Sequence, residues 1–321
     1  MQLNTLFITA IFASTFGISA AFAAGEGWTT DLEAAKKTAV VEKKSLLLEF
    51  TGSDWCPPCK MLKKEVFSQE EFTAGVKDKL ILVQFDFPKD KSKLTPETIE
   101  QNQATAGKYG IQGYPTILLA DETGKPFAMT GYKPGGAESY VKHLDELIAK
   151  RTERDESLAA AAKLEGVAKS KALIAVLKSM GLQDDMLTNF YSDEIAAIKS
   201  ADPSDESGFM KDIETKKKFA DFQNELNTLG GNEDFEGALQ LTEKALASGD
   251  FKGEQLTQIT IFKGIINMQL GKKEVALKAL DEAIAIDPAN PMNARIEAMK
   301  KQIAAAPAPE RKEPAPETKA D

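Results

Sequence analysis

The sequence predicts an α/β domain, built on a mixed central sheet flanked by helices, followed by an all-α, helical-repeat-like domain. Over roughly residues 26–150, short apolar runs typical of buried strands alternate with amphipathic helical patterns. After residue 150 these strand patterns disappear, and alanine, leucine, lysine and glutamate recur at helical spacing. The length of 321 residues suits two domains.

The N-terminal segment has the pattern of a secretory signal peptide. Residues 6–18 are apolar, and Ala21-Phe22-Ala23 is a small-x-small sequence, so we expect residues 1–23 to be removed by cleavage after Ala23. The first residues carry no lysine or arginine, which leaves an uncleaved membrane anchor as the alternative. With cleavage, the mature protein is expected to be periplasmic or secreted.

The elements of the α/β domain follow one another with short connections. Residues 45–51 and 80–87 are apolar runs of the kind found in central parallel strands, which are buried on both faces. The other expected elements are a helix over 31–44, a helix after the cysteine pair that continues to about residue 72, a helix over 102–109 that continues from a cap signal at Thr95-Pro96, a strand over 117–120, its hairpin partner over 126–130, and a closing helix over 136–150. Residues 88–97, rich in lysine, aspartate and proline, are expected to form a solvated loop, with shaping of a partner surface as the alternative.

The helical half, residues 151–303, carries a repeat pattern near its end. Small and apolar residues fall at the relative spacings of a tetratricopeptide motif: Gly264, Gly271, Ala276, Leu280, Ala283 and Pro288. A weaker upstream copy places the repeat-like region at about residues 219–300. This half either binds a partner or extends the fold. Residues 202–208 are expected to form a linker or loop between helices, and the proline-rich tail over 304–321 is expected to be disordered.

The sequence Trp55-Cys56-Pro57-Pro58-Cys59-Lys60 holds both cysteines of the chain. It lies between an apolar strand and a helical pattern, so Cys56 is expected to cap that helix, with Pro57 at its first position. A thiol there gains from the free backbone N–H groups and the positive end of the helix dipole, which favour the thiolate. We therefore expect Cys56 to attack a partner's sulfur and the more buried Cys59 to resolve the mixed disulfide.

With two further segments in the correct order, this motif resembles the thioredoxin-like family of CxxC thiol:disulfide oxidoreductases. The first is residues 108–116, which include Gly113-Tyr114-Pro115-Thr116, and the second is Gly131; the likeness covers roughly residues 26–150. The resemblance implies a thioredoxin fold. It also implies a cis Pro115 packed against the cysteine pair, and a backbone at Tyr114 that pairs with an extended substrate peptide.

The resemblance also assigns a role to Glu49, in the strand before the motif. The family places a buried acidic residue there, usually aspartate, which relays a proton to or from the resolving thiol. In this chain the residue is a glutamate, and one extra residue separates it from Trp55. Burial beside an apolar strand is expected to raise the pKa of this carboxyl, which suits a general base for a thiol.

Other uses of the cysteine pair have weaker support. A zinc site needs four ligands, and the one histidine, His143, is distant in sequence. A structural disulfide that closes so short a loop stabilises little, and copper delivery lacks an accompanying methionine or histidine cluster. We therefore expect no metal or cofactor. The net charge of −9 argues against a nucleic-acid partner and against a polybasic membrane surface.

The leading functional prediction is a cell-envelope thiol:disulfide oxidoreductase. Its partners would be exported proteins with cysteines or disulfides, which would cross Tyr114-Pro115 beside the flat Trp55 ring, and an upstream electron donor or acceptor. No cation stands between the cysteines, because both intervening residues are proline, and this favours a reductant or isomerase over an oxidant. The alternative is an interaction protein, in which the helical half recruits a partner and the thioredoxin domain is a redox sensor or docking unit.

Overall fold

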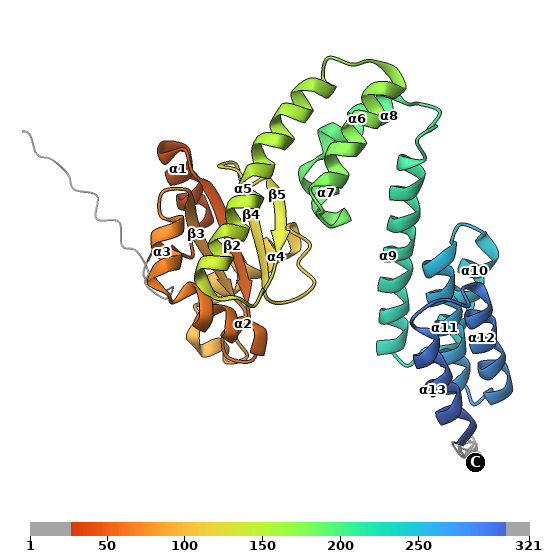
Figure 1. Cartoon of the computed structure of the whole chain (residues 1–321). Helices are drawn as coiled ribbons and strands as arrows, with labels where there is room; N and C mark the ends of the chain where they lie inside the picture. The colour runs from red at the N-terminus through yellow and green to blue at the C-terminus, as the bar shows by residue number, and fades with distance from the viewer. Residues whose placement is uncertain (1–26, 306–321) are drawn as a thin grey trace, which may run out of the picture. The chain divides into compact units, whose positions relative to one another are not determined.

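The computed structural model describes residues 27–305 and divides the chain into two compact units, with the division between Ser207 and Gly208. The predicted signal peptide, residues 1–23, and the tail from residue 306 lie outside the described residues. Unit 1 contains the predicted α/β fold. The described part of unit 2 consists of helices joined by loops, as expected from the loss of strand patterns (Figure 1).

A mixed five-stranded sheet forms the centre of unit 1, in the order β1-β3-β2-β4-β5. Its strands are β1 (Trp28–Thr29), β2 (Ser45–Thr51), β3 (Leu80–Asp86), β4 (Thr116–Ala120) and β5 (Pro126–Thr130). Strands β1, β3 and β2 are parallel, whereas β4 and β5 run antiparallel to their neighbours. Every residue of β2 is buried, as its continuous apolar run predicts. The two-residue β1 was not predicted.

Helices cover both faces of the sheet (Figure 1). On one face, the apolar side chains of β2 pack with α1 (Leu32–Glu42), α4 (Pro96–Lys108) and the residue that follows α4, Tyr109. The other face is covered by helices that include α3 (Glu70–Val76) and α5 (Gly136–Ala161). Side chains set the starts of α1 and α4, where Asp31 and Thr95 accept hydrogen bonds from backbone N–H groups of the first turn.

The helix after the cysteine pair is shorter than predicted. α2 (Pro57–Leu62) continues into a π-helical turn, η1 (Lys63–Phe67), and the chain then leaves the helix before α3 begins. The extended backbone of Gln69 separates the two helices. The apolar side chains Val66, Phe67 and Phe72 are all buried on both sides of this break, so the apolar pattern continues through it although the helix does not.

The helices after α5 pack onto the core of unit 1. They are α6 (Gly166–Ser179), α7 (Asp184–Phe190) and α8 (Ser192–Ala201). Met186 is fully buried among the side chains of β2, and the Phe190 ring lies 4.6 Å from that of Tyr109. The Tyr191 hydroxyl donates to the carbonyl of Pro126 at 2.6 Å. α5 itself extends past residue 150, where the junction between domains was expected.

A buried ion pair links α5 to the turn between β4 and β5. The Arg154 guanidinium lies 3.1 Å from a carboxylate oxygen of Asp121 and 3.2 Å from the Tyr191 hydroxyl. The side chains of Arg154 and Asp121 are only 6% and 9% exposed. Three segments, α5, the β4–β5 turn and the start of α8, therefore meet at one charged contact.

Unit 2 consists of antiparallel helices with two apolar clusters. Its helices are α9 (Phe209–Gly231), α10 (Phe235–Ser248), α11 (Gly253–Gln269), α12 (Lys273–Ile286) and α13 (Asn293–Ala305). At Gly264 of α11, an added Cβ would come within 2.9 Å of the buried Leu280 side chain of α12. Glycine therefore permits the close approach of these two helices. Across residues 27–305, no helix combines the length and the apolar character that crossing a bilayer requires.

Candidate active site

Cys56 and Cys59 lie at the start of α2, directly after β2 and a short turn. Cys56 is the N-cap residue, with an extended backbone, and Pro57 occupies the first helical position, as predicted. The two sulfur atoms form a disulfide. The backbone N–H of Cys59 donates to the Cys56 Sγ, with 3.3 Å between nitrogen and sulfur. The cap position therefore brings a helical N–H donor to the sulfur that was predicted to be the nucleophile.

Both cysteines are buried in this disulfide form, Cys56 at 3% and Cys59 at 1% exposure. Cys59 is the more buried of the two, as predicted, but the difference is small. The residues next to them in sequence are more exposed: Trp55 is 38% exposed, and Pro57 and Lys60 are exposed as well. In the disulfide form, Cys56 therefore presents little surface to a partner's sulfur, and the residue before it is an exposed tryptophan.

Trp55 has a fixed orientation because its Nε1–H donates to the carbonyl of Phe87 at 2.8 Å. Its ring meets the Tyr114 ring edge to face, with 5.7 Å between centroids. The Tyr114–Pro115 peptide bond is cis, as the resemblance implies. A Cβ on Gly131 would lie 3.1 Å from the Pro115 carbonyl oxygen, so this glycine permits the close approach of the two segments. The structure thus brings Trp55 together with Tyr114.

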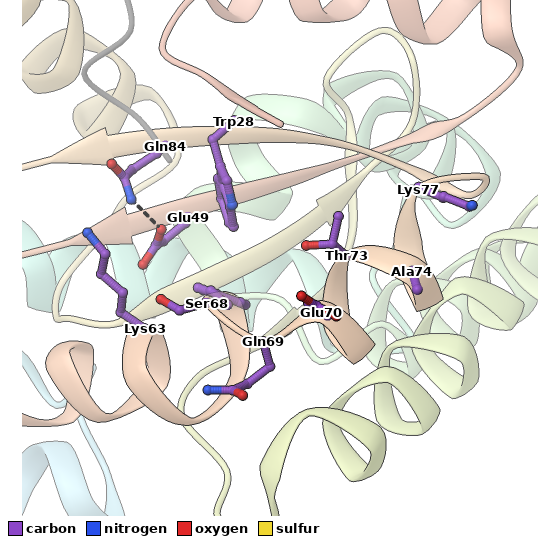
Figure 2. Close-up of a pocket in the computed structure, with 11 residues that line it drawn as sticks. Trp28, Glu49, Lys63, Ser68, Gln69, Glu70, Thr73, Ala74, Lys77 and Gln84 are labelled. Atoms are coloured by element: carbon purple, nitrogen blue, oxygen red, sulfur yellow. Dashed lines mark hydrogen bonds between the residues drawn. The ribbon is translucent and has the colours of Figure 1, made fainter. Parts of the chain in front are cut away.

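Glu49 is 2% exposed and accepts a hydrogen bond from the Gln84 side chain at 2.8 Å. Burial raises the pKa of its carboxyl from the usual 4.5 to about 7, because desolvation disfavours the charged form more than the bond from Gln84 favours it. Glu49 lines a pocket of about 580 Å³. Figure 2 shows Lys63 extending toward the same carboxyl. Within residues 27–305, Glu49 makes no hydrogen bond to either cysteine.

Two residues that contact members of the candidate site or its turn were missed in the sequence. Gln84 lies directly beside Glu49 in the parallel pairing of β2 with β3, so the register of the two apolar runs was the available signal. Asp54 accepts hydrogen bonds from the backbone N–H groups of Lys89 and Asp90, at 2.9 and 3.1 Å. These bonds hold the pKa of the Asp54 carboxyl at about 2. The contact between Asp54 and the segment after β3 joins residues far apart in the chain, and no pattern in the sequence indicates it.

Residues 32–148 match the family model described as a thioredoxin-like domain. The chain is also 31% identical over 134 residues to the disulfide bond reductase DsbH of Chlamydia pneumoniae, and this match covers 42% of the chain and 78% of DsbH. The chain belongs to the thioredoxin-like family. Thioredoxin of Bacillus subtilis (strain 168) is 35% identical over 92 residues, a match that covers 28% of the chain and 74% of that thioredoxin.

Among solved structures, one described as DsbH oxidoreductase is 28% identical to this thioredoxin-like protein, with a TM-score of 0.37. The match covers 44% of the chain and 95% of that structure. Family membership and the Cys56–Cys59 disulfide together make the protein a thiol:disulfide oxidoreductase.

Proposed function

We propose that this protein reduces or isomerises disulfides of exported proteins through Cys56 and Cys59. The observation that carries the proposal is the hydrogen bond from the Cys59 N–H to the Cys56 Sγ at the start of α2. In the dithiol form, the same N–H and the helix dipole stabilise negative charge on Cys56. Cys56 then acts as the nucleophile and Cys59 as the resolving thiol.

The exchange proceeds in two displacements. The Cys56 thiolate attacks one sulfur of the substrate disulfide and releases the other as a thiolate, which takes up a proton. Cys59, after losing its proton, attacks the Cys56 sulfur and releases the second substrate thiolate, with formation of the Cys56–Cys59 disulfide. Two electrons pass to the substrate, and a separate dithiol donor must restore the reduced pair. Glu49 is assigned as the base for Cys59, and a pKa of about 7 suits that task.

The direction of electron flow is proposed from two observations. The residues between the cysteines are both proline, so no cation there stabilises the thiolate as strongly as in oxidants. DsbH, the relative with which the chain shares 31% identity, is described as a disulfide bond reductase. Both favour reduction or isomerisation over oxidation.

The substrate is proposed to bind as an extended segment beside the cysteine pair. Trp55 supplies a half-exposed aromatic face, and the backbone of Tyr114, before the cis Pro115, offers hydrogen bonds to the segment. The signal-like residues 1–23 support a location in the cell envelope, with a periplasmic or secreted mature chain.

A second role is proposed for unit 2, as a repeat-like module that recruits a protein partner. Ala276 and Ala283, at motif positions of α12, are fully buried, and Gly264 allows α11 and α12 to approach closely. Ala238, which lies 38 residues before Ala276 and matches it in the weaker upstream copy of the motif, is also buried, in α10. In this alternative the thioredoxin-like domain serves as a sensor or docking unit.

The proposal is tested by reduction of insulin with dithiothreitol as the electron donor. The wild type should accelerate precipitation of the insulin chains above the rate with dithiothreitol alone, whereas Cys56→Ser should not. Equal inactivity of the two proteins, with capture of a partner by unit 2, would favour the alternative.

A further inference from the structure

The segment from Phe87 to Leu94 is fixed against the turn that carries the cysteine pair. Phe87 accepts the hydrogen bond from the Trp55 indole, and Asp54 accepts the backbone N–H groups of Lys89 and Asp90. The composition of residues 88–97 predicts a solvated loop here. The structure shows an exposed segment whose backbone is tied to the two residues before Cys56.

The acidic and basic side chains of this segment differ in what they contact. Asp54 and Asp90 direct their carboxylates at backbone N–H groups of the segment itself. The three lysines of the segment are exposed. The Nζ of Lys89 lies 5.9 Å from the centroid of the Trp55 ring. Lys93 pairs with Asp54 at 3.4 Å. Neither Lys89 nor Lys91 forms an ion pair with a carboxylate among residues 27–305. Lys89 and Lys91 are therefore exposed cations of the segment without a carboxylate partner in the described part of the chain, whereas Asp54 and Asp90 are engaged by backbone N–H groups.

We infer that Lys89 and Lys91 form a recognition site for acidic side chains that flank the cysteine of a substrate protein. The inference rests on the proposed function, because it concerns the substrate of the same cysteine pair. A segment that crosses the exposed Trp55 ring to reach Cys56 places its neighbouring side chains close to Lys89. The chain as a whole carries a net charge of −9 and repels acidic proteins. A local positive site next to the reactive sulfur offsets that repulsion where contact occurs.

The bonds to Asp54 matter because they fix the backbone that presents the lysines. A lysine on a free loop loses more conformational entropy on binding than one whose backbone is already held. The acidic groups nearest in sequence after the segment, Glu97 and Glu100, lie in the first turns of α4. Hydrogen bonds from its own backbone N–H and from the Thr95 hydroxyl engage the Glu97 carboxylate and lower its pKa. The surface beside Trp55 thus presents lysines.

The test uses short synthetic peptides, each with one cysteine, oxidised to symmetric disulfide dimers. In three otherwise identical peptides, the residues that flank the cysteine are glutamate, glutamine or lysine. Reduction is followed with dithiothreitol as donor at low ionic strength. The wild type should give the highest kcat/KM with the glutamate peptide and the lowest with the lysine peptide. Added salt should narrow the differences, because exposed charges are screened.

The variant K89Q/K91Q should lower kcat/KM for the glutamate peptide about three- to tenfold, as expected for two exposed charge pairs. Its rate with the glutamine peptide should stay within about twofold of wild type. The matched control K37Q/K163Q removes two exposed lysines that lie outside the segment and the cysteine turn, and it should keep the wild-type order. The pH dependence of Cys56 alkylation should be the same in all three proteins.

Three results overturn the inference in different ways. Equal rates for the glutamate and glutamine peptides in the wild type would show that no such recognition site exists, but they would leave the proposed function intact. An equal loss for all three peptides in K89Q/K91Q, with a shifted alkylation profile, assigns the lysines to the Cys56 thiolate instead. Failure to reduce any of the peptides removes the proposed function together with this inference.

Discussion

The backbone N–H of Cys59 points at the sulfur of Cys56 across 3.3 Å. Once the disulfide is reduced, this donor favours the thiolate of Cys56 over its thiol, and the dipole of α2 acts in the same direction. The pKa of Cys56 should therefore lie below the value of about 8.5 for a free thiol.

This pKa is measurable in Cys59→Ser, where Cys56 is the one remaining thiol and residue 59 keeps its N–H. The rate of alkylation by iodoacetamide should rise with pH and reach half of its maximum at least about one pH unit below 8.5. A midpoint at 8.5 or above would contradict a role for Cys56 as the nucleophile.

The same substitution should trap substrates. Without the Cys59 thiol, the mixed disulfide between Cys56 and a substrate has no internal route to resolution. Cys59→Ser purified from the envelope of the producing cell should carry exported proteins that dithiothreitol releases. Cys56→Ser/Cys59→Ser is the control and should carry none. Equal amounts on both variants would show that capture does not proceed through Cys56.

Glu49 should make the stability of unit 1 depend on pH. Its pKa is raised from 4.5 to about 7 on folding, so the folded state holds this proton more tightly than the unfolded state. The stabilisation that results is fully present below pH 4.5 and is lost as the pH rises through 7. Relative to Glu49→Gln, the wild type should thus lose on the order of 3 kcal/mol in free energy of unfolding between these pH values.

Urea unfolding at a series of pH values measures this difference. Both tryptophans of the chain, Trp28 and Trp55, lie in unit 1, so their fluorescence reports the unfolding of that unit. If the difference in free energy of unfolding between wild type and Glu49→Gln stays constant from pH 4.5 to 7, the pKa of Glu49 is not raised on folding.

Glu49→Gln should also slow disulfide reduction at neutral pH. An unchanged pH–rate profile would contradict the role of Glu49 as a base.

Arg154 should be critical for unit 1 although it lies beyond residue 150. Replacing it with methionine leaves Asp121 buried without its partner, a change that typically costs about 3–5 kcal/mol. Tryptophan fluorescence in urea should show this loss, and the double variant Arg154→Met/Asp121→Asn should recover much of it. A loss below about 1 kcal/mol in Arg154→Met would mean that α5 and the β4–β5 turn do not depend on the ion pair.

Gly264 should be required for the packing of unit 2. An alanine Cβ there would come within 2.9 Å of Leu280 and 3.2 Å of the Ala276 carbonyl oxygen, so Gly264→Ala should destabilise unit 2 by about 1–3 kcal/mol. Gly230→Ala is the control: its Cβ meets nothing within 4 Å, and alanine favours the helix. Circular dichroism should show the loss, with the tryptophan transition unchanged. An equal effect of both variants would argue against close packing at Gly264.

The parts of the fold that were predicted correctly are those encoded in local patterns. The apolar run of β2, the cap at Thr95, and the proline after Cys56 each determine a nearby element by themselves. The π-helical turn before Ser68 was not predictable in this way, because the buried positions continue the same apolar pattern on both sides of it.

Contacts between distant segments account for most of what was missed. Phe190 packs on Tyr109 from a helix whose own spacing indicates only that one face is buried, not against what. Likewise, the pairing of Gln84 with Glu49 follows from strand register, and the bonds of Asp54 follow from the path of the chain after β3. A single sequence gives the candidates for the site but not these neighbours.

The contacts of Met186, Phe190 and Tyr191 with the first 150 residues have a consequence for biosynthesis. While the nascent chain is still on the ribosome, the carbonyl of Pro126 and the ring of Tyr109 lack their partners, Tyr191 and Phe190, which are translated 65 and 81 codons later. The residues of the redox centre are thus translated early, whereas α7 and Tyr191, which complete the packing of the domain, are translated late.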